Sequence, residues 1–168
     1  ILVGNKHTNL RQMVEQELAA KDVASRVQEI RFREINQQQV SAAELTLQDF
    51  TYTTAVSDEH FLQWVTADNK IAGFCRLSLP HWDKLTSGAC DVTANELLVQ
   101  PGQAMIRELH VYGQALSLGS EGMSAQHQGL GQKLLAKASS IAAEAGYTSL
   151  NVISSIGTRA YYRAQGFT

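Results

Sequence analysis

The stretch of sequence that decides the fold is Gln126-His127-Gln128-Gly129-Leu130-Gly131, a glycine-bearing turn between a predicted strand and a predicted helix. Such a turn directs several backbone N–H groups, and the positive end of the helix dipole, toward one point. Glycine at positions 129 and 131 lets the backbone approach an anion without a Cβ in the way. The stretch therefore predicts a diphosphate site at the start of the helix.

Two common classes of diphosphate site are disfavoured. Gly131 leads into Gln132-Lys133-Leu134, whereas a P-loop would continue with lysine and then serine or threonine. A Rossmann site is disfavoured because the third glycine of its pattern is absent, and because hairpins predicted upstream do not suit a doubly wound sheet.

The apolar spacing on both sides of the turn predicts the remaining elements. Downstream, a helix from Leu130 ends at Gly146 and precedes a strand and a short helix; upstream lie strands, two of which form a hairpin. This order indicates a mostly antiparallel sheet with one parallel crossover at its C-terminal side. The predicted strands cover 27–35, 47–54, 60–67, 71–79, 104–115 and 148–154, the predicted helices cover 9–20, 130–145 and 158–165, and 81–103 is predicted to be a loop or weak strand.

Composition narrows the classes of function. The 168 residues suffice for one domain, 44% of them are apolar, and no apolar run is long enough for a membrane span. The net charge of −2 gives the chain no general attraction to nucleic acid, so tRNA phosphates would have to meet a local basic surface. Arg26, Arg31 and Arg33 form such a surface, or else only a solvated strand face. Cys75 and Cys90 are expected to be reduced and buried, and no metal site is predicted.

Two motifs together resemble the GNAT superfamily of acetyltransferases. The run from Gln126 into the helix resembles motif A, whose loop wraps the pyrophosphate of CoA, and Tyr162-Arg163-Ala164-Gln165-Gly166-Phe167 resembles the superfamily's YxxxGF ending. In those enzymes the tyrosine often reaches the sulfur of CoA as a general acid. The resemblance implies an α/β GNAT fold: a mixed, mostly antiparallel sheet flanked by helices, whose parallel strands 104–115 and 148–154 splay apart to hold acetyl-CoA.

Three runs carry a closer resemblance, to the acetyltransferase domain of the catalytic subunit of Elongator and its bacterial and archaeal stand-alone relatives. They are residues 107–113 (RELHVYG), 126–131 (QHQGLG) and 152–163 (VISSIGTRAYYR). The resemblance implies a cytoplasmic acyltransferase that uses acetyl-CoA to place a carboxymethyl-type group on C5 of the wobble uridine in the anticodon of tRNA.

The same resemblance bears on domain organisation. In that family a radical S-adenosylmethionine domain with an iron–sulfur cluster precedes the acetyltransferase domain in cis, and its cysteine triplet is absent here. S-adenosylmethionine and the cluster are therefore not expected on this chain, which starts at Ile1 and is expected to be part of a longer protein. A single domain is predicted over 1–168, with N-terminal helix and strands over 1–60 and an acetyl-CoA-binding core over 61–168. Its oligomeric state stays open.

Three residues are predicted to take part in catalysis. Tyr162 would protonate the departing thiolate, or else only pack its ring in the core; Glu108 would be a general base, or else form a structural ion pair. His110 would hold the pantetheine arm or a water, or else be a half-buried, hydrogen-bonded histidine. Backbone groups of Glu108 to Val111 would pair with the arm and polarise the thioester carbonyl, and N–H groups of 128–132 would hold the diphosphate. The predicted cofactor-binding residues are Glu108, Leu109, His110, Val111, Gln126, Gln128, Gly129, Leu130, Gly131, Gln132, Tyr161 and Tyr162.

Two other functions are compatible with these residues. A free-standing GNAT enzyme would acetylate an amine on a protein or small molecule, and a non-catalytic module would sense acyl-CoA without turnover. One observation identifies each of the three functions. The tRNA-modifying enzyme hydrolyses acetyl-CoA only with tRNA, the free-standing enzyme N-acetylates an amine, and the sensing module binds acyl-CoA without turnover.

Overall fold

The computed structural model describes residues 9–21, 27–36, 40–86, 100–112 and 129–168. The chain divides into two compact units, residues 1–34 and residues 35–168, which we describe separately. The prediction of a single domain over 1–168, with its division at residue 60, stays a prediction. No helix in the described ranges is both long and apolar enough to cross a membrane.

The first unit contains helix α1 (Leu10–Ala20), which confirms the predicted helix and buries none of its side chains. The strand predicted over 27–35 is wrong, because residues 30–33 form a turn. The carboxylate of Glu29 accepts a hydrogen bond from the Phe32 N–H at 2.7 Å, and the Arg33 N–H donates to the Ile30 carbonyl at 3.1 Å. These local bonds close the chain on itself and compete with strand pairing.

Arg31 and Arg33 do not share one solvated face, which corrects the prediction that these arginines lie together on a solvated strand face. Arg31 is exposed, whereas Arg33 is only 7% exposed. Burial lowers the pKa of the Arg33 guanidinium below its ordinary value. Arg26 lies outside the described residues.

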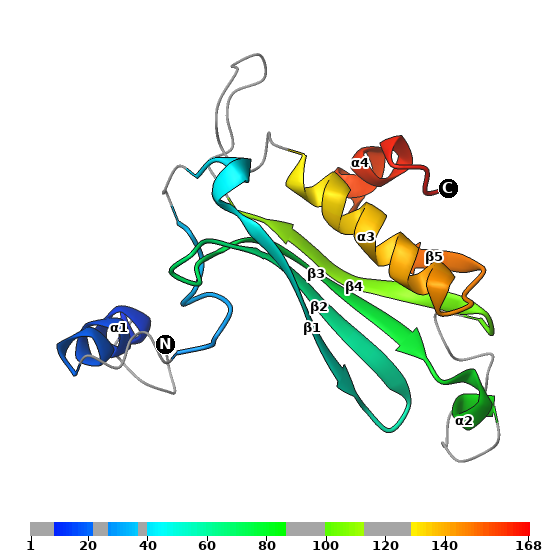
Figure 1. Cartoon of the computed structure of the whole chain (residues 1–168), viewed down its shortest axis with the longest axis horizontal. Coiled ribbons are helices and arrows are strands. Elements are labelled where there is room, and N and C mark those ends of the chain that lie inside the picture. The colour runs from blue at the N-terminus through cyan, green and yellow to red at the C-terminus, as the bar shows by residue number, and fades with distance from the viewer. Residues whose placement is uncertain (1–8, 22–26, 37–39, 87–99, 113–128) are drawn as a thin grey trace, which may run out of the picture. The chain divides into compact units, whose positions relative to one another are not determined.

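The second unit is built on a five-stranded sheet whose strands follow one another in chain order (Figure 1). The first three pairings are antiparallel and the last is parallel. The predicted mixed, mostly antiparallel sheet is thus confirmed, and so is the hairpin, whose turn carries Asn69 in the left-handed conformation with φ of 64°. The strands are β1 (Thr46–Thr53), β2 (Ser57–Val65), β3 (Ile71–Pro80), β4 (Gln103–Val111) and β5 (Ser149–Val152).

Helix α3 (Leu130–Glu144) covers one face of this sheet (Figure 1). Its side chains Leu134, Leu135, Ala138 and Ala142 join alternate residues of β3 in the main core, because successive strand residues point to opposite faces. Gly146 follows the helix with φ of 87°, as its predicted place after the helix end requires. The main core is completed by Leu62 of β2, Cys75, Leu77 and Leu79 of β3, Ala104 and Ile106 of β4, and Tyr162.

The shorter helices lie at the ends of strands. Helix α4 (Arg159–Ala164) confirms the predicted C-terminal helix, and the one-turn 3₁₀ helices are η2 (Ala42–Glu44) and η5 (Ile156–Thr158). Helix α2 (Trp82–Thr86) corrects the prediction that 81–103 is only loop or weak strand. It starts after Pro80 because the His81 carbonyl accepts from the N–H groups of Lys84 and Leu85 at 3.1 and 3.0 Å.

The pairings of strand β4 with its two neighbours both change next to Ile106. Its pairing with β5 covers only Gln103–Ile106, although β4 continues to Val111. Its pairing with β3 shifts register there, since Arg76 pairs with Glu108 and Leu77 pairs with Ile106. Arg107 is therefore the extra residue of a β-bulge. The predicted splay of the parallel pair is confirmed: beyond Ile106, β4 carries main-chain groups that β5 does not pair.

Candidate functional site

The first turn of α3 starts from a glycine in the left-handed conformation. Gly129, the residue before the helix, has φ of 68°. This left-handed backbone conformation raises the free energy of every residue except glycine. The first helical bond runs from the Lys133 N–H to the Gly129 carbonyl at 3.0 Å, so the N–H groups of residues 130–132 have no carbonyl one turn earlier in the helix. No acidic side chain lies in this turn. Among the described residues, this turn therefore carries no carboxylate that would repel an anion.

Gly131 brings this turn against two other elements. A Cβ placed at Gly131 would stand 2.6 Å from the Tyr161 Oη of α4 and 3.4 Å from the Val111 Cγ2 at the end of β4. The predicted loop, strand and C-terminal helix therefore meet at one point, and glycine is required for them to meet. Tyr161 and Val111 occupy the space beside the Gly131 Cα, so what the structure offers a diphosphate is the N–H groups of residues 130–132, and the site stays a prediction.

The two tyrosines of α4 take different positions. Tyr161 is 40% exposed, and its hydroxyl lies beside Gly131. Tyr162 is 8% exposed and shares the main core with Ile106 and Val152, the pair of residues at which β4 and β5 part. Its ring meets that of Phe167 edge-on at 5.6 Å.

Burial raises the pKa of both tyrosine hydroxyls above the ordinary value. For Tyr162 burial is the largest cause, and the neighbouring Tyr161 and Cys75 add to it. For Tyr161 burial is again the largest cause of the raised pKa, and Cys75 is the second. Both hydroxyls therefore stay protonated at neutral pH, the state in which a tyrosine donates a proton or a hydrogen bond.

The predicted residues of β4 divide between the two faces of the sheet. Leu109 packs against the main core, and Val111 packs against the small cluster that contains Leu130. Glu108 forms an ion pair with Arg76 at 3.7 Å, the alternative to a general base that the sequence leaves open. His110 is exposed rather than half-buried, and its ring stacks on Phe74 at 5.8 Å. The catalytic roles of Glu108 and His110 stay predictions.

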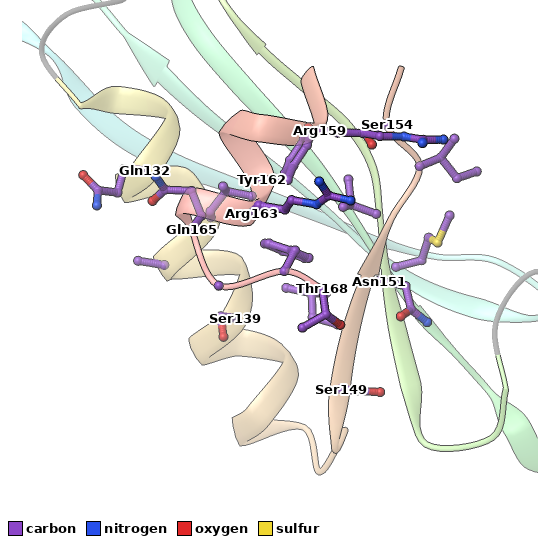
Figure 2. Close-up of a pocket in the computed structure, with 18 residues that line it drawn as sticks. Gln132, Ser139, Ser149, Asn151, Ser154, Arg159, Tyr162, Arg163, Gln165 and Thr168 are labelled. Atoms are coloured by element: carbon purple, nitrogen blue, oxygen red, sulfur yellow. The ribbon is translucent and has the colours of Figure 1, made fainter. Parts of the chain in front are cut away.

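A groove of about 940 Å³ lies between α3, β5 and α4. Of the predicted site residues it includes Gln132 and Tyr162, but not the glycines, Tyr161 or the end of β4. Figure 2 shows Tyr162 and Arg163 in it, with the Arg163 side chain extended toward β5. The groove includes Gln132 but neither Gly129 nor Gly131, and the diphosphate site at the start of α3 stays a prediction.

The sequence matches the Acetyltransferase (GNAT) family over residues 26–167. The chain belongs to this family of GNAT acetyltransferases. Family membership implies use of acetyl-CoA.

The resemblance of this GNAT chain to the Elongator catalytic subunit is confirmed by curated relatives. It is 37% identical, over 95% of its length, to a tRNA uridine(34) acetyltransferase of Dehalococcoides mccartyi, and covers 34% of that protein. It is 32% identical, over 98% of its length, to Elongator complex protein 3 of Danio rerio, and covers 29% of that protein. The chain thus spans about a third of the length of these relatives.

A solved structure is similar over the whole GNAT chain. Elp3 of the archaeon Methanocaldococcus infernus, with residues 1–46 deleted, superposes with a TM-score of 0.73 at 26% identity. The superposition covers all of this chain and 39% of the archaeal chain. The predicted GNAT fold is confirmed.

The remaining predicted residues are two glutamines and two cysteines, and two arginines at the groove were not predicted. Gln126 and Gln128 lie outside the described residues, as does Cys90; Cys75 is fully buried, as predicted. Arg159 and Arg163 line the groove. The signal for this in the sequence is their spacing of four residues, which puts both side chains on one face of α4. Within the described ranges, His, Cys, Asp and Glu form no group of three that could hold a metal.

Proposed function

We propose that this chain is the acetyl-CoA-binding, acyl-transferring part of an enzyme that modifies uridine 34, the wobble uridine, of tRNA. The observation that carries the proposal is the convergence of Gly131, Val111 and Tyr161 at the open first turn of α3. The names of the similar proteins, a tRNA uridine(34) acetyltransferase and Elongator complex protein 3, support tRNA as the substrate. Oligomeric state does not enter the proposal.

The residues of the chain divide the work of binding and transfer. The N–H groups of the first turn of α3 bind the diphosphate, and the main chain of β4 beyond Ile106 pairs with the pantetheine arm that enters the splay. Acetyl-CoA supplies the activated acyl group when it is bound there. Main-chain donors at the bulge hydrogen-bond the thioester carbonyl, and negative charge developing on that oxygen strengthens these bonds.

Tyr162 is the proposed acid in this arrangement. Its burial keeps the hydroxyl protonated, and the core that it shares with Ile106 and Val152 holds its ring at the point where the strands part. The hydroxyl donates its proton, or a hydrogen bond, to the leaving thiolate. Tyr161 borders the diphosphate instead. Glu108 and His110 lie on β4, where either side chain has access to the acceptor or to a water.

The setting of the whole protein follows from the same proposal. S-adenosylmethionine and an iron–sulfur cluster are bound by a radical S-adenosylmethionine domain in cis, outside this chain, and the anticodon region of tRNA is the partner. A tRNA substrate and the buried thiol of Cys75 suit the cytoplasm.

The test compares Tyr162→Phe with Tyr161→Phe. Tyr162→Phe should bind acetyl-CoA with unchanged affinity, since the ring still packs, and should lower tRNA-dependent acetyl-CoA turnover by roughly 10²–10⁴-fold. Tyr161→Phe should reduce turnover much less. Calorimetry measures binding, and thiol release with and without tRNA measures turnover.

Three outcomes contradict the proposal. Full activity of Tyr162→Phe removes its hydroxyl from the mechanism. Acetylation of a simple amine without tRNA indicates a free-standing N-acetyltransferase. Tight binding of acetyl-CoA by the wild-type chain with no turnover, even when the radical domain and tRNA are supplied, indicates an acyl-CoA-sensing module.

A further inference from the structure

A carboxylate is buried on the face of the sheet opposite α3. Glu59 of β2 is 3% exposed, and its Oε1 accepts hydrogen bonds from the Ser57 hydroxyl at 2.8 Å and the Ser78 hydroxyl at 2.6 Å. Ser78 lies directly across from Glu59 on β3. Two hydroxyls from two strands thus fix one oxygen of this carboxylate and leave the other oxygen, Oε2, for a different partner.

That partner is the bulge residue of β4. The Arg107 Nη1 lies 3.4 Å from the Glu59 Oε2, although the Arg107 side chain is itself half exposed. Water screens a partly buried ion pair less than a surface pair, and removal of one partner leaves the buried charge without its counter-charge. The buried carboxylate therefore holds Arg107 at a defined position on this face.

At Arg107 the pairing of β4 with β3 shifts register, and the pairing with β5 has just ended. It is the unpaired residue in the register shift opposite Arg76 and Leu77, and it follows the last pair with β5, Ile106 with Val152. A bulge without further contacts has several conformations of similar energy, since the ladder does not fix its extra residue. The link to Glu59 selects one of them.

We propose that Glu59 is a positioning residue for acyl transfer, which acts through Arg107 to hold the β4 bulge in the conformation that presents the main chain of residues 107–109 to the thioester. This inference rests on the proposed function for the place of the thioester. The holding of the bulge itself concerns only Glu59, Arg107 and β4, so it is measurable without any ligand.

Two substitutions break the link from opposite ends. In Glu59→Gln the amide oxygen keeps both serine donors while its NH₂ group turns a donor toward the guanidinium, so the buried site stays filled and the ion pair is lost. In Arg107→Met an uncharged chain of similar reach replaces a half-exposed side chain, so the Glu59 carboxylate keeps its two serine donors and loses its counter-charge. The matched control is Asp58→Asn, which breaks the 2.9 Å pair of the neighbouring β2 residue with His81.

The first measurement is amide hydrogen exchange without ligand. We expect residues 107–111 to exchange at least about tenfold faster in Glu59→Gln and in Arg107→Met, while α3 keeps its wild-type rates. Asp58→Asn should leave exchange in β4 unchanged. Wild-type exchange over 107–111 in both variants overturns the proposal, whatever the ligand of the site is.

The second measurement separates positioning from stability alone. Calorimetry first establishes that the wild-type chain binds acetyl-CoA; if it does not, the proposed function fails and takes this inference with it. Given binding, the two variants should lower kcat about tenfold or more with KM for acetyl-CoA within about twofold, because the diphosphate contacts at α3 are intact. Unchanged kcat in variants whose β4 exchanges faster overturns the positioning role and leaves the proposed function standing.

Discussion

Gly131 shows at the scale of one residue how the site depends on an absent side chain. Its missing Cβ is what lets the start of α3 lie against Tyr161 and Val111. Neighbouring Gly129 serves a different need, since it adopts the left-handed backbone conformation, with φ of 68°. The two glycines of the motif are thus fixed for two separate physical reasons.

A Gly131→Ala substitution should weaken acetyl-CoA binding and lower stability by about 1–3 kcal/mol, the range for overpacked sites. The new methyl group would stand 2.6 Å from the Tyr161 Oη, so the tyrosine has to move. Gly131→Arg should abolish CoA binding altogether and leave the circular dichroism nearly unchanged. Calorimetry and thermal unfolding measure both effects.

Removal of the obstructing oxygen provides the control for this prediction. Gly131→Ala combined with Tyr161→Phe should recover much of the lost stability, because the atom that the methyl group meets is gone. A double variant as unstable as Gly131→Ala would show that Tyr161 is not the obstacle.

Single-residue roles could be predicted from the sequence only where a motif fixes the spacing. The glycines and the tyrosine pair belong to such motifs, and the structure brings Gly131 and Tyr161 together. The contact between Glu59 and Arg107 joins positions 48 residues apart and depends on a bulge, for which the sequence has no signal. The Arg76–Glu108 pair was likewise only one of two open alternatives.

At the scale of elements, residues 27–35 show why alternation alone does not establish a strand. Ile30 and Phe32 alternate with Arg31 and Arg33 as in a half-buried strand. The decisive feature is instead the Glu29 carboxylate, which captures the Phe32 N–H and closes a turn. Helix α3 was predictable because many of its residues agree on one period, and β3 because it is an apolar run that follows a turn.

The two arginines of this turn should respond differently to charge reversal. Arg31→Glu should change the free energy of unfolding by less than about 0.5 kcal/mol, because the side chain is exposed. Arg33→Glu should cost about 3 kcal/mol or more, since it puts an opposite charge into the place of a buried guanidinium. Urea unfolding followed by circular dichroism measures both.

Binding of tRNA gives these variants a second measurement. If Arg31 contacts a phosphate, Arg31→Glu should weaken tRNA binding at low salt and reduce the slope of log K against log salt by about one. An unchanged slope places the RNA surface elsewhere.

At the scale of the whole molecule, the main core makes stability depend on pH. Burial raises the pKa of the Cys75 thiol from 9.0 to about 12. Between these values the unfolded chain loses the thiol proton while the folded chain keeps it, so stability falls as pH rises. Below the lower value the thiol is protonated in both states and contributes no pH dependence.

Wild type should therefore lose about 2 kcal/mol relative to Cys75→Ala between about pH 8 and pH 10.5, because the unfolded thiol is then about 1.5 pH units above its pKa. Tyr161 and Tyr162 act in the same direction in both proteins, and most of their contribution cancels because burial, not Cys75, is the largest cause of their raised pKa values. Denaturant midpoints at the two pH values measure the difference. Parallel pH profiles for the two proteins would show that Cys75 does not cause the loss.

The order of the strands has a consequence for how the molecule acquires its structure. Strands β1, β2 and β3 are joined by the short connections 54–56 and 66–70, whereas β5 reaches β4 only through the crossover that contains α3. Closing a short loop costs little chain entropy, and pairings between near neighbours in sequence form quickly. We therefore expect the antiparallel strands to assemble early in folding, and during synthesis from the N-terminus they do so before α4 exists. The proposed acyl-transfer site, which needs α4, then forms after the antiparallel strands have assembled.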